Sequence, residues 1–233
     1  MASHVSKTFL RKQEGYYRGD ERNRNRIASP GSQYLIQLLG GGYLDDYSDC
    51  TEKKVLDAGC GAGFNLVGLS MMGFEVYGCD ISDDIVAYAE DNVKKFGAHA
   101  TVVTGENQAL PFESGYFDLL VSMNVIHYVN SEAGMTRSIA EYARVLKTGG
   151  RLILSTNHPA NWILKDAEKL GKNVFRLNCR TDFRHRDLFF VFEDANELRR
   201  YFEPDFSHLK IGENQMEFFD KCLRNFVLTG IKK

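Results

Sequence analysis

Short apolar runs alternate with amphipathic stretches along the middle of this chain. Two stretches, 81–96 and 131–147, carry apolar residues at helical spacing, and the Gly149-Gly150 pair is expected to end the second one. Strands that alternate with helices predict βαβ units and a parallel sheet with helices on both faces. The apolar runs that indicate the strands are KKVLDA (53–58), FEVYGC (74–79), ATVVT (100–104), YFDLLVSMN (116–124) and RLILST (151–156).

The chain before this region has a different pattern. Residues 1–31 are polar and rich in arginine and show neither strand nor helix periodicity, which indicates an irregular arm or lid. Residues 32–39 then follow helical spacing behind Ser32 as N-cap, and three glycines at 40–42 end the pattern. We expect residues 1–49 to form a lid and one docking helix.

The alternation stops after residue 156. Residues 157–188 have mixed polarity, and we expect an insert that covers the acceptor site. A helix at 194–202 and two strands at 206–212 and 225–232 follow. Two consecutive strands without a helix between them pair as a hairpin, so the last strand should run antiparallel to the rest of the sheet.

The most informative segment joins the first predicted strand to a helix. Gly59, Gly61 and Gly63 lie in VLDAGCGAGF, directly after a buried strand. Glycines permit positive φ and close approach of a ligand, and the following helix offers free N–H groups at its N-terminus. Asp80 ends the next strand, where a carboxylate can accept hydrogen bonds from both hydroxyls of a ribose. The two features together predict a site for a nucleotide-like ligand.

The glycine spacing separates two classes of nucleotide-binding protein. A dinucleotide-dependent dehydrogenase carries GxGxxG, whereas here the third glycine comes one residue early and Phe64 stands in the last position. The segment at 57–63, DAGCGAG, instead resembles the first motif of the class I S-adenosylmethionine (SAM)-dependent methyltransferases, with Asp80 as the ribose-binding acid.

Further segments between about residues 50 and 156 are similar to that family. The segment 105–112, GENQALPF, resembles the one whose acidic residue and next backbone N–H meet the adenine ring, although Glu106 replaces the commoner Asp. Segments 116–120, 124–127 and 146–150 also resemble the family. The cofactor-binding residues that the resemblance implies are Asp57, Gly59, Cys60, Gly61, Gly63, Asp80, Ile81, Glu106, Asn107 and Asn124.

The resemblance also implies a fold and a cofactor. The fold is an α/β Rossmann-like one, with a seven-stranded, mostly parallel sheet of order 3-2-1-4-5-7-6, an antiparallel last strand and helices on both faces. We expect residues 1–233 to form a single domain of this class. SAM would bind across the carboxyl ends of strands one, two and four, and S-adenosylhomocysteine would be the product.

The composition fits a globular protein of this kind. With 233 residues, 43% hydrophobic and 26% charged, the chain can bury a full core. Its five cysteines form no CxxC pair, so we expect reduced thiols and no metal site. No apolar run approaches the ~18 residues of a membrane span, and no signal-peptide core is present, so we expect a cytoplasmic location and no membrane partner. A net charge of −2 disfavours a long nucleic acid as partner.

The sequence offers few candidates for acceptor chemistry. His127 follows the fourth strand and His158 follows the fifth, and either imidazole could take a proton from the acceptor. The alternative for each is an ordinary half-buried histidine. The arm and the insert interleave arginines with aromatic residues, which would suit an anionic group on the acceptor or on the cofactor. The acceptor or lid residues predicted on this basis are Tyr16, Tyr17, Arg18, Trp162 and Arg184.

Three functions remain open at this point. The first is methyl transfer from SAM to a small molecule by in-line displacement, for which we hypothesise an anionic acceptor. The second is modification of RNA, although the fourth strand ends in SMNV (122–125) and lacks the (N/D)PP(Y/F) signature of enzymes that methylate exocyclic amines of bases. The third is a non-catalytic protein that binds SAM or its product, because the glycine turn and Asp80 concern only the cofactor. The oligomeric state stays open.

Overall fold

The computed structural model describes residues 33–44, 47, 49–180 and 182–233. The predicted arm at 1–31, with Tyr16, Tyr17 and Arg18, lies outside the described residues. Within them, no helix is both long and apolar enough to cross a membrane.

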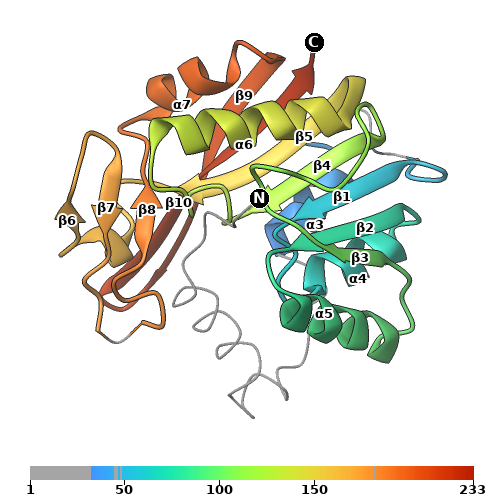
Figure 1. Ribbon diagram of the computed structural model, residues 1–233, viewed down its shortest axis with the longest axis horizontal. Helices are drawn as coiled ribbons and strands as arrows, with labels where there is room; N and C mark the ends of the chain where they lie inside the picture. Colours follow the sequence, from blue (N-terminus) through green and yellow to red (C-terminus); the bar gives the residue numbers. More distant parts are fainter. Residues whose placement is uncertain (1–32, 45–46, 48, 181) are drawn as a thin grey trace. The chain divides into compact units, whose positions relative to one another are not determined.

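Seven strands form the main sheet in the order β3-β2-β1-β4-β5-β10-β9 (Figure 1), which confirms the strand order that the resemblance implies. The closing strand β10 runs antiparallel to both of its neighbours, as the hairpin prediction requires. The strands are β1 Lys54–Ala58, β2 Glu75–Asp80, β3 Thr101–Thr104, β4 Phe117–Met123, β5 Leu146–Asn157, β9 Phe206–Phe218 and β10 Lys221–Lys232.

The described residues group into two compact units. The first contains those within 1–106 together with 117–119, and the second contains 107–116 together with 120–233. The first unit therefore holds β1, β2, β3 and the start of β4, and the second holds the remaining strands.

In the first unit, β2 pairs in parallel with β1 on one side and with β3 on the other. Helices α4 and α5 contact these strands (Figure 1). Ser82 caps α5 by accepting a hydrogen bond from the N–H of Asp84, and acidic residues in the first turn and lysines in the last turn complement the helix dipole. The helices of this unit are α3 Gln33–Gly40, α4 Phe64–Met71 and α5 Asp83–Lys95.

The second unit contains helices α6 Glu132–Val145 and α7 Ala195–Phe202. Helix α6 ends earlier than the sequence predicts, because the N–H groups of Gly115 and Tyr116 donate to its last carbonyls at 2.8 Å each. Leu146 is already extended, and the Gly149-Gly150 pair lies inside β5. The prediction that this glycine pair ends the helix is therefore wrong.

The insert has a small core of its own, which also includes Phe189 and Val191 beyond the predicted boundary at residue 188. Its three short strands form an antiparallel sheet in the order β6-β7-β8, and a 3₁₀ turn, η1, precedes them. The side chains buried in this core are Ile163, Leu177, Phe189 and Val191. The elements are η1 Trp162–Leu164, β6 Glu168–Lys169, β7 Val174–Arg176 and β8 Leu188–Phe190.

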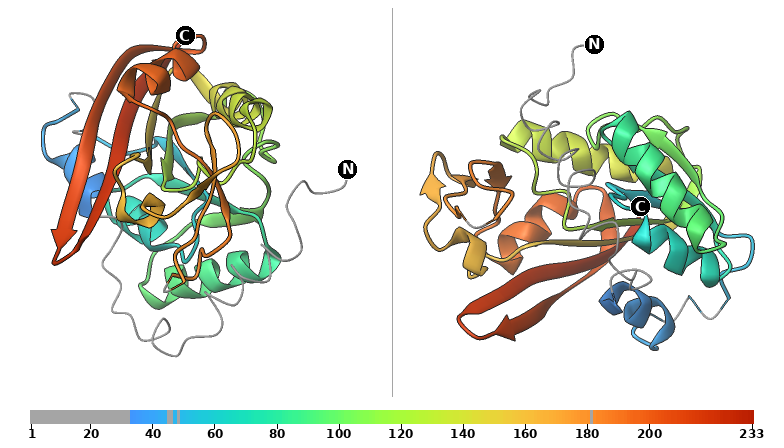
Figure 2. Two further views of the ribbon diagram at one scale, coloured as in Figure 1. Left: turned by 90° about the vertical axis from the view of Figure 1, so that its left-hand side faces the viewer. Right: turned by 90° about the horizontal axis from the view of Figure 1, so that it is seen from below.

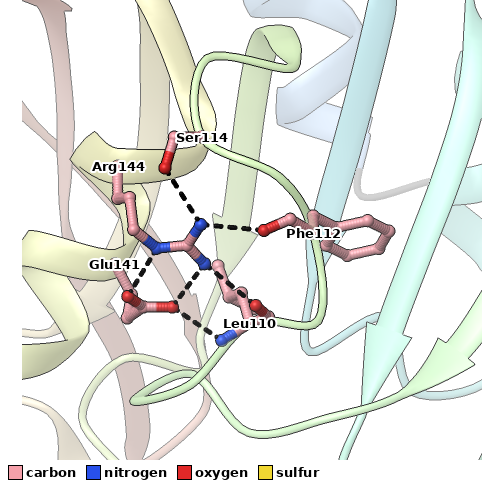
Figure 3. Close-up of polar contacts among 5 residues, drawn as sticks. All are labelled: Leu110, Phe112, Ser114, Glu141 and Arg144. Atoms are coloured by element: carbon pink, nitrogen blue, oxygen red, sulfur yellow. Dashed lines mark hydrogen bonds and ion pairs between the residues drawn. The ribbon is translucent and has the colours of Figure 1, made fainter.

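A clamp from α6 holds the loop that precedes β4 (Figure 3). Arg144 binds both carboxylate oxygens of Glu141 at 2.7 and 2.8 Å and donates to the carbonyls of Phe112 and Leu110 at 2.8 and 2.9 Å. Its contact with the Ser114 hydroxyl is longer, at 3.4 Å. Glu141 completes the clamp by accepting from the N–H of Leu110 at 2.8 Å. The end of the predicted adenine segment is thus fixed to α6 at several backbone groups.

We expect Arg144→Ala to lower the free energy of unfolding at pH 7 by about 2–3 kcal/mol, because it leaves Glu141 and two carbonyls without their cationic donor. The Arg144 hydrogen bonds lower the pKa of Glu141 below its ordinary 4.5. The stabilisation should therefore be present above pH 4.5 and disappear as the pH falls through the lower, folded-state value. Urea unfolding at several pH values measures both effects. The exposed Arg137 of the same helix, changed to Ala, is the control and should stay within about 0.5 kcal/mol of the parent.

Candidate active site

The glycine turn between β1 and α4 is left-handed at three positions. Gly59, Gly61 and Gly63 have φ values of 82°, 53° and 78°. At Gly63, which caps α4, an added Cβ would also lie 3.1 Å from the carbonyl oxygen of Ala89. Positive φ and close packing therefore both require glycine here. The turn leaves the N-terminus of α4 without a side-chain cap, so its N–H groups can serve a ligand.

Asp80, at the end of β2, is bound to the glycine turn. Its Oδ2 accepts from the N–H of Gly61 at 2.7 Å, and its Oδ1 accepts from the N–H of Ile81 at 2.8 Å. Each carboxylate oxygen can accept about two hydrogen bonds, so each keeps capacity for a hydroxyl of a ribose. Burial raises the pKa of Asp80 above its ordinary 3.8, while the two N–H bonds oppose that shift.

Asp57, at the end of β1, is fully buried. Among the described residues neither carboxylate oxygen accepts a hydrogen bond of normal geometry. Burial raises its pKa from 3.8 to about 7, an effect that the nearby Asn65 side chain reduces and the charge of Asp80 increases. A buried carboxylate of this kind fits a cationic group of a ligand.

The predicted adenine-binding acid lies beside Asp80. The N–H of Gly105 donates to the carbonyl of Asp80 at 2.8 Å, so the chain leaving β3 passes the end of β2 directly before Glu106. Glu106 is half-buried. The first unit thus brings together eight of the predicted cofactor residues. They are Asp57, Gly59, Cys60, Gly61, Gly63, Asp80, Ile81 and Glu106.

One contributor to this turn is absent from the sequence-based predictions. The buried Asn92 of α5 donates from Nδ2 to the carbonyl of Ala62 at 2.9 Å and so ties the middle of the glycine turn to the helix. The sequence signal was a polar residue on the apolar face of an amphipathic helix, beside Ala89 and Val93.

The second unit contains the remaining predicted cofactor residues, Asn107 and Asn124. Asn124 directly follows β4 and has a φ of 59°, which is uncommon for a residue other than glycine. Ser155 of β5 holds it there, because the Asn124 N–H donates to the Ser155 hydroxyl at 3.0 Å and that hydroxyl reaches Asn124 Oδ1 at 3.1 Å. Strained residues that are fixed in this way are common at functional sites.

The surroundings of His127 argue against the base role predicted for it. The side chain is 1% exposed and contacts the rings of Tyr128 and Phe189, at centroid distances of 4.8 and 4.3 Å. Neither ring nitrogen has a hydrogen-bond partner among the described residues. Burial, followed by the charge of Arg184, lowers its pKa to about 3. A base that weak and that enclosed is poorly matched to proton transfer near neutral pH.

His158, directly after β5, is more accessible. Its Nδ1 accepts from the N–H of Ala160 at 3.0 Å, and its Nε2 lies 3.7 Å from a carboxylate oxygen of Glu213. Its ring packs on Phe226 at 4.5 Å, and burial lowers its pKa below 6.5. His158 therefore remains the better placed of the two predicted bases.

Trp162 and Arg184, the predicted acceptor residues within the described part of the chain, line one cavity of the second unit. The guanidinium of Arg184 forms two hydrogen bonds of 2.8 Å with the carboxylate of Asp182. This pairing weakens the prediction that Arg184 supplies a charge for an anionic acceptor.

The comparisons with known proteins agree with this geometry. A family model described as a methyltransferase domain matches residues 56–154. An uncharacterized methyltransferase of Synechocystis sp. is 38% identical over 153 residues, which are 65% of this chain and 70% of the relative. The chain belongs to the class I SAM-dependent methyltransferases.

Other relatives of this methyltransferase extend the comparison. A ubiquinone biosynthesis O-methyltransferase of Yersinia pestis is 26% identical over 209 residues, 84% of this chain and 81% of the relative. The protein PH0226 of Pyrococcus horikoshii shares the fold, with a TM-score of 0.67 at 21% identity over 98% of this chain and 100% of the other. The match with this chain spans only 58% and 48% of the length of two further relatives.

The methyltransferase uses SAM, and the first unit offers donors and acceptors that suit it. A ribose can meet the free acceptor capacity of Asp80, and a cationic ammonium group can meet the buried carboxylate of Asp57. The N–H groups at the start of α4 can serve a carboxylate. The buried carboxylate of Asp57 is the feature that favours SAM over a dinucleotide, because the pyrophosphate of a dinucleotide offers no ammonium group to it.

We expect Asp57→Asn to stabilise the protein without cofactor above pH 7. The folded chain disfavours an ionised Asp57, and this lowers the free energy of unfolding of the parent. The loss of stability is absent below pH 3.8, grows between pH 3.8 and about 7, and is complete above that. Each unit of difference between the folded and unfolded pKa values changes the free energy of unfolding by ~1.4 kcal/mol, so the variant can gain at most ~4 kcal/mol. Thermal melts should show the variant more stable at pH 8 and equal to the parent at pH 4, and the same variant should bind SAM more weakly. A variant less stable than the parent at pH 8 would contradict this account of Asp57.

Asp80→Asn should lower the affinity for SAM and for S-adenosylhomocysteine about ten- to hundredfold, because an amide cannot accept both hydroxyls and both backbone N–H groups. Calorimetric titration measures the loss. Asp91→Asn, an exposed change of equal charge on α5, should bind as the parent does. Equal affinity in Asp80→Asn and the parent would mean that Asp80 does not hold the ribose.

Proposed function

We propose that this methyltransferase transfers the methyl group of SAM to an oxygen, nitrogen or sulfur atom of a small organic molecule. The main support is the cavity of about 460 Å³ in the second unit, which matches the size of a small-molecule site. The likeness to a ubiquinone biosynthesis O-methyltransferase over 84% of the chain gives further support.

The charges of the second unit favour a small molecule over RNA. A surface that tracks a phosphate backbone needs cations that are available to it. Here three arginines of the insert and the hairpin face carboxylates at 2.5 to 2.8 Å. The pairs are Arg176 with Glu168, Arg184 with Asp182, and Arg224 with Glu213.

The proposed roles follow from the contacts of each residue. Asp80 accepts from the ribose hydroxyls, Asp57 faces the ammonium group, and Glu106 with the Asn107 N–H meets the adenine ring. SAM supplies an electrophilic methyl group, so the protein mainly has to align the acceptor for an in-line displacement. Where the acceptor atom carries a proton, His158 is the group proposed to receive it.

A radiolabel transfer assay tests this proposal. The full chain is incubated with methyl-labelled SAM and, separately, with phenols, carboxylic acids, amines, thiols and bulk RNA. We expect label on a small molecule, none on RNA, and a loss of at least tenfold in kcat/KM with Asp80→Asn. Label on RNA alone would replace this proposal with nucleic-acid modification, and tight SAM binding with no transfer to any class would favour a SAM-binding protein without activity.

A further inference from the structure

The C-terminal hairpin extends past the strand that supports it (Figure 2). The pairing of β10 with β5 ends at Asn225 and Asn157, whereas its pairing with β9 continues to Lys221 and Phe218. The last part of the hairpin is therefore a two-stranded ribbon at the carboxyl end of β5.

This ribbon exposes large apolar side chains. Phe219 is 98% exposed, Phe218 is 59% exposed and Met216 is 46% exposed. Phe219 also has a φ of 56° in the two-residue turn, a conformation that favours Gly or Asn. The turn therefore holds a phenyl ring in water and in an unfavourable backbone conformation, and a ligand that covered the ring would remove part of the cost of its exposure.

The cavity lies against this ribbon. Its lining joins the hairpin tip to the insert, and apolar and aromatic side chains form much of the wall. The lining residues are Trp162, Asp182, Arg184, Phe218, Phe219, Asp220, Lys221 and Leu223.

The charges around the cavity are balanced. Arg184 is paired with Asp182 at 2.8 Å, and the ammonium of Lys221 lies over the Trp162 ring at 4.4 Å. Two acidic and two basic side chains thus line the same space, so the lining has no net charge that would select an ion.

Hydrogen bonds fix the cavity to the end of β5. The N–H of His158 donates to the carbonyl of Arg224 at 3.1 Å, next to Leu223 of the cavity wall. Asn161 donates to the same carbonyl and to Asn157 Oδ1 at 3.0 Å each. The cavity thus lies beyond the carboxyl end of β5, and in open α/β sheets ligands bind beyond the carboxyl ends of the strands.

We propose that this cavity holds the non-reacting part of the acceptor, and that this part is an uncharged aromatic ring bearing an alkyl chain. The inference rests on the proposed small-molecule function and makes its acceptor more specific. Apolar walls favour the ring and chain, the balanced charges remove any demand for an anion, and the volume of about 460 Å³ accommodates a molecule of that size.

The single tryptophan of the sequence gives a direct readout, because Trp162 lies in the cavity wall. The full chain, saturated with S-adenosylhomocysteine, is titrated with phenol, 4-butylphenol and 4-hexylphenol, and with benzoate and benzylamine as charged counterparts. We expect a saturable change in fluorescence for the alkylphenols, with affinity rising by roughly fourfold per added methylene. Benzoate and benzylamine should bind more weakly than 4-butylphenol. Trp162→Phe should abolish the signal, which shows that it arises from the tryptophan and not from the eleven tyrosines.

Two variants test the hairpin tip. Phe219→Asn removes the exposed ring and suits the turn, and it should weaken 4-hexylphenol binding about fivefold or more. Met71→Gln, an exposed apolar position of α4 that does not line the cavity, is the control and should bind as the parent does. Both variants should keep the parental affinity for SAM by calorimetry, so a failure of the cofactor site is distinguished from a failure of the cavity.

Several outcomes would overturn the inference while leaving methyl transfer intact. One is SAM binding without any saturable alkylphenol signal, and another is tighter binding of benzoate than of the alkylphenols. Binding of the chain to phosphatidylcholine vesicles that Phe219→Asn abolishes, without an alkylphenol response, would assign the tip to a membrane surface. Self-association that the same variant abolishes would assign it to a second copy of the chain. Failure of the parent to bind SAM would instead contradict the proposed function itself.

Discussion

The hydrogen bond from the Gly61 N–H to the carboxylate of Asp80 is the contact on which the cofactor half of this methyltransferase depends. This hydrogen bond of 2.7 Å joins the turn after β1 to the end of β2 and orients the carboxylate of Asp80. The left-handed glycines make this approach possible, and Asn92 holds the same turn from α5. A second acid, Asp57, is buried nearby, and among the described residues neither of its carboxylate oxygens accepts a hydrogen bond of normal geometry.

The sequence predicted those parts of the fold that depend on local pattern. The βα alternation, the strand order implied by the family resemblance and the antiparallel closing strand are all confirmed. The end of α6 was predicted wrongly, because the carbonyls of Arg144 and Val145 are satisfied by N–H groups about thirty residues earlier in the chain. Such a long-range partner leaves no mark on helical periodicity. The small core of the insert was also missed, since its strands have only two or three residues each.

The residues of the candidate site likewise divide into those that a local pattern predicts and those that depend on distant contacts. The positive φ of Gly61 is predictable from its place in the glycine motif, whereas the ribose-binding role of Asp80 stays a prediction. The environment of His127 was not predictable, since its burial depends on Phe189, which is 62 residues away and packs in the core of the insert. Ser155 and Asn161 were missed because their roles are to hold other polar groups in place, and an isolated Ser or Asn in a strand or loop gives no pattern.

The separate core of the insert has a consequence for how this enzyme could change over time. Ile163, Leu177, Phe189 and Val191 pack on one another and on neighbours that all belong to the second unit. Substitutions at this core or along the hairpin ribbon leave the hydrogen bonds of the glycine turn untouched, so their effects should combine nearly independently with changes there. With the roles proposed above for the cavity and the glycine turn, acceptor preference could diverge through the insert and the ribbon while the same turn is retained, which would give the scaffold capacity for new substrates.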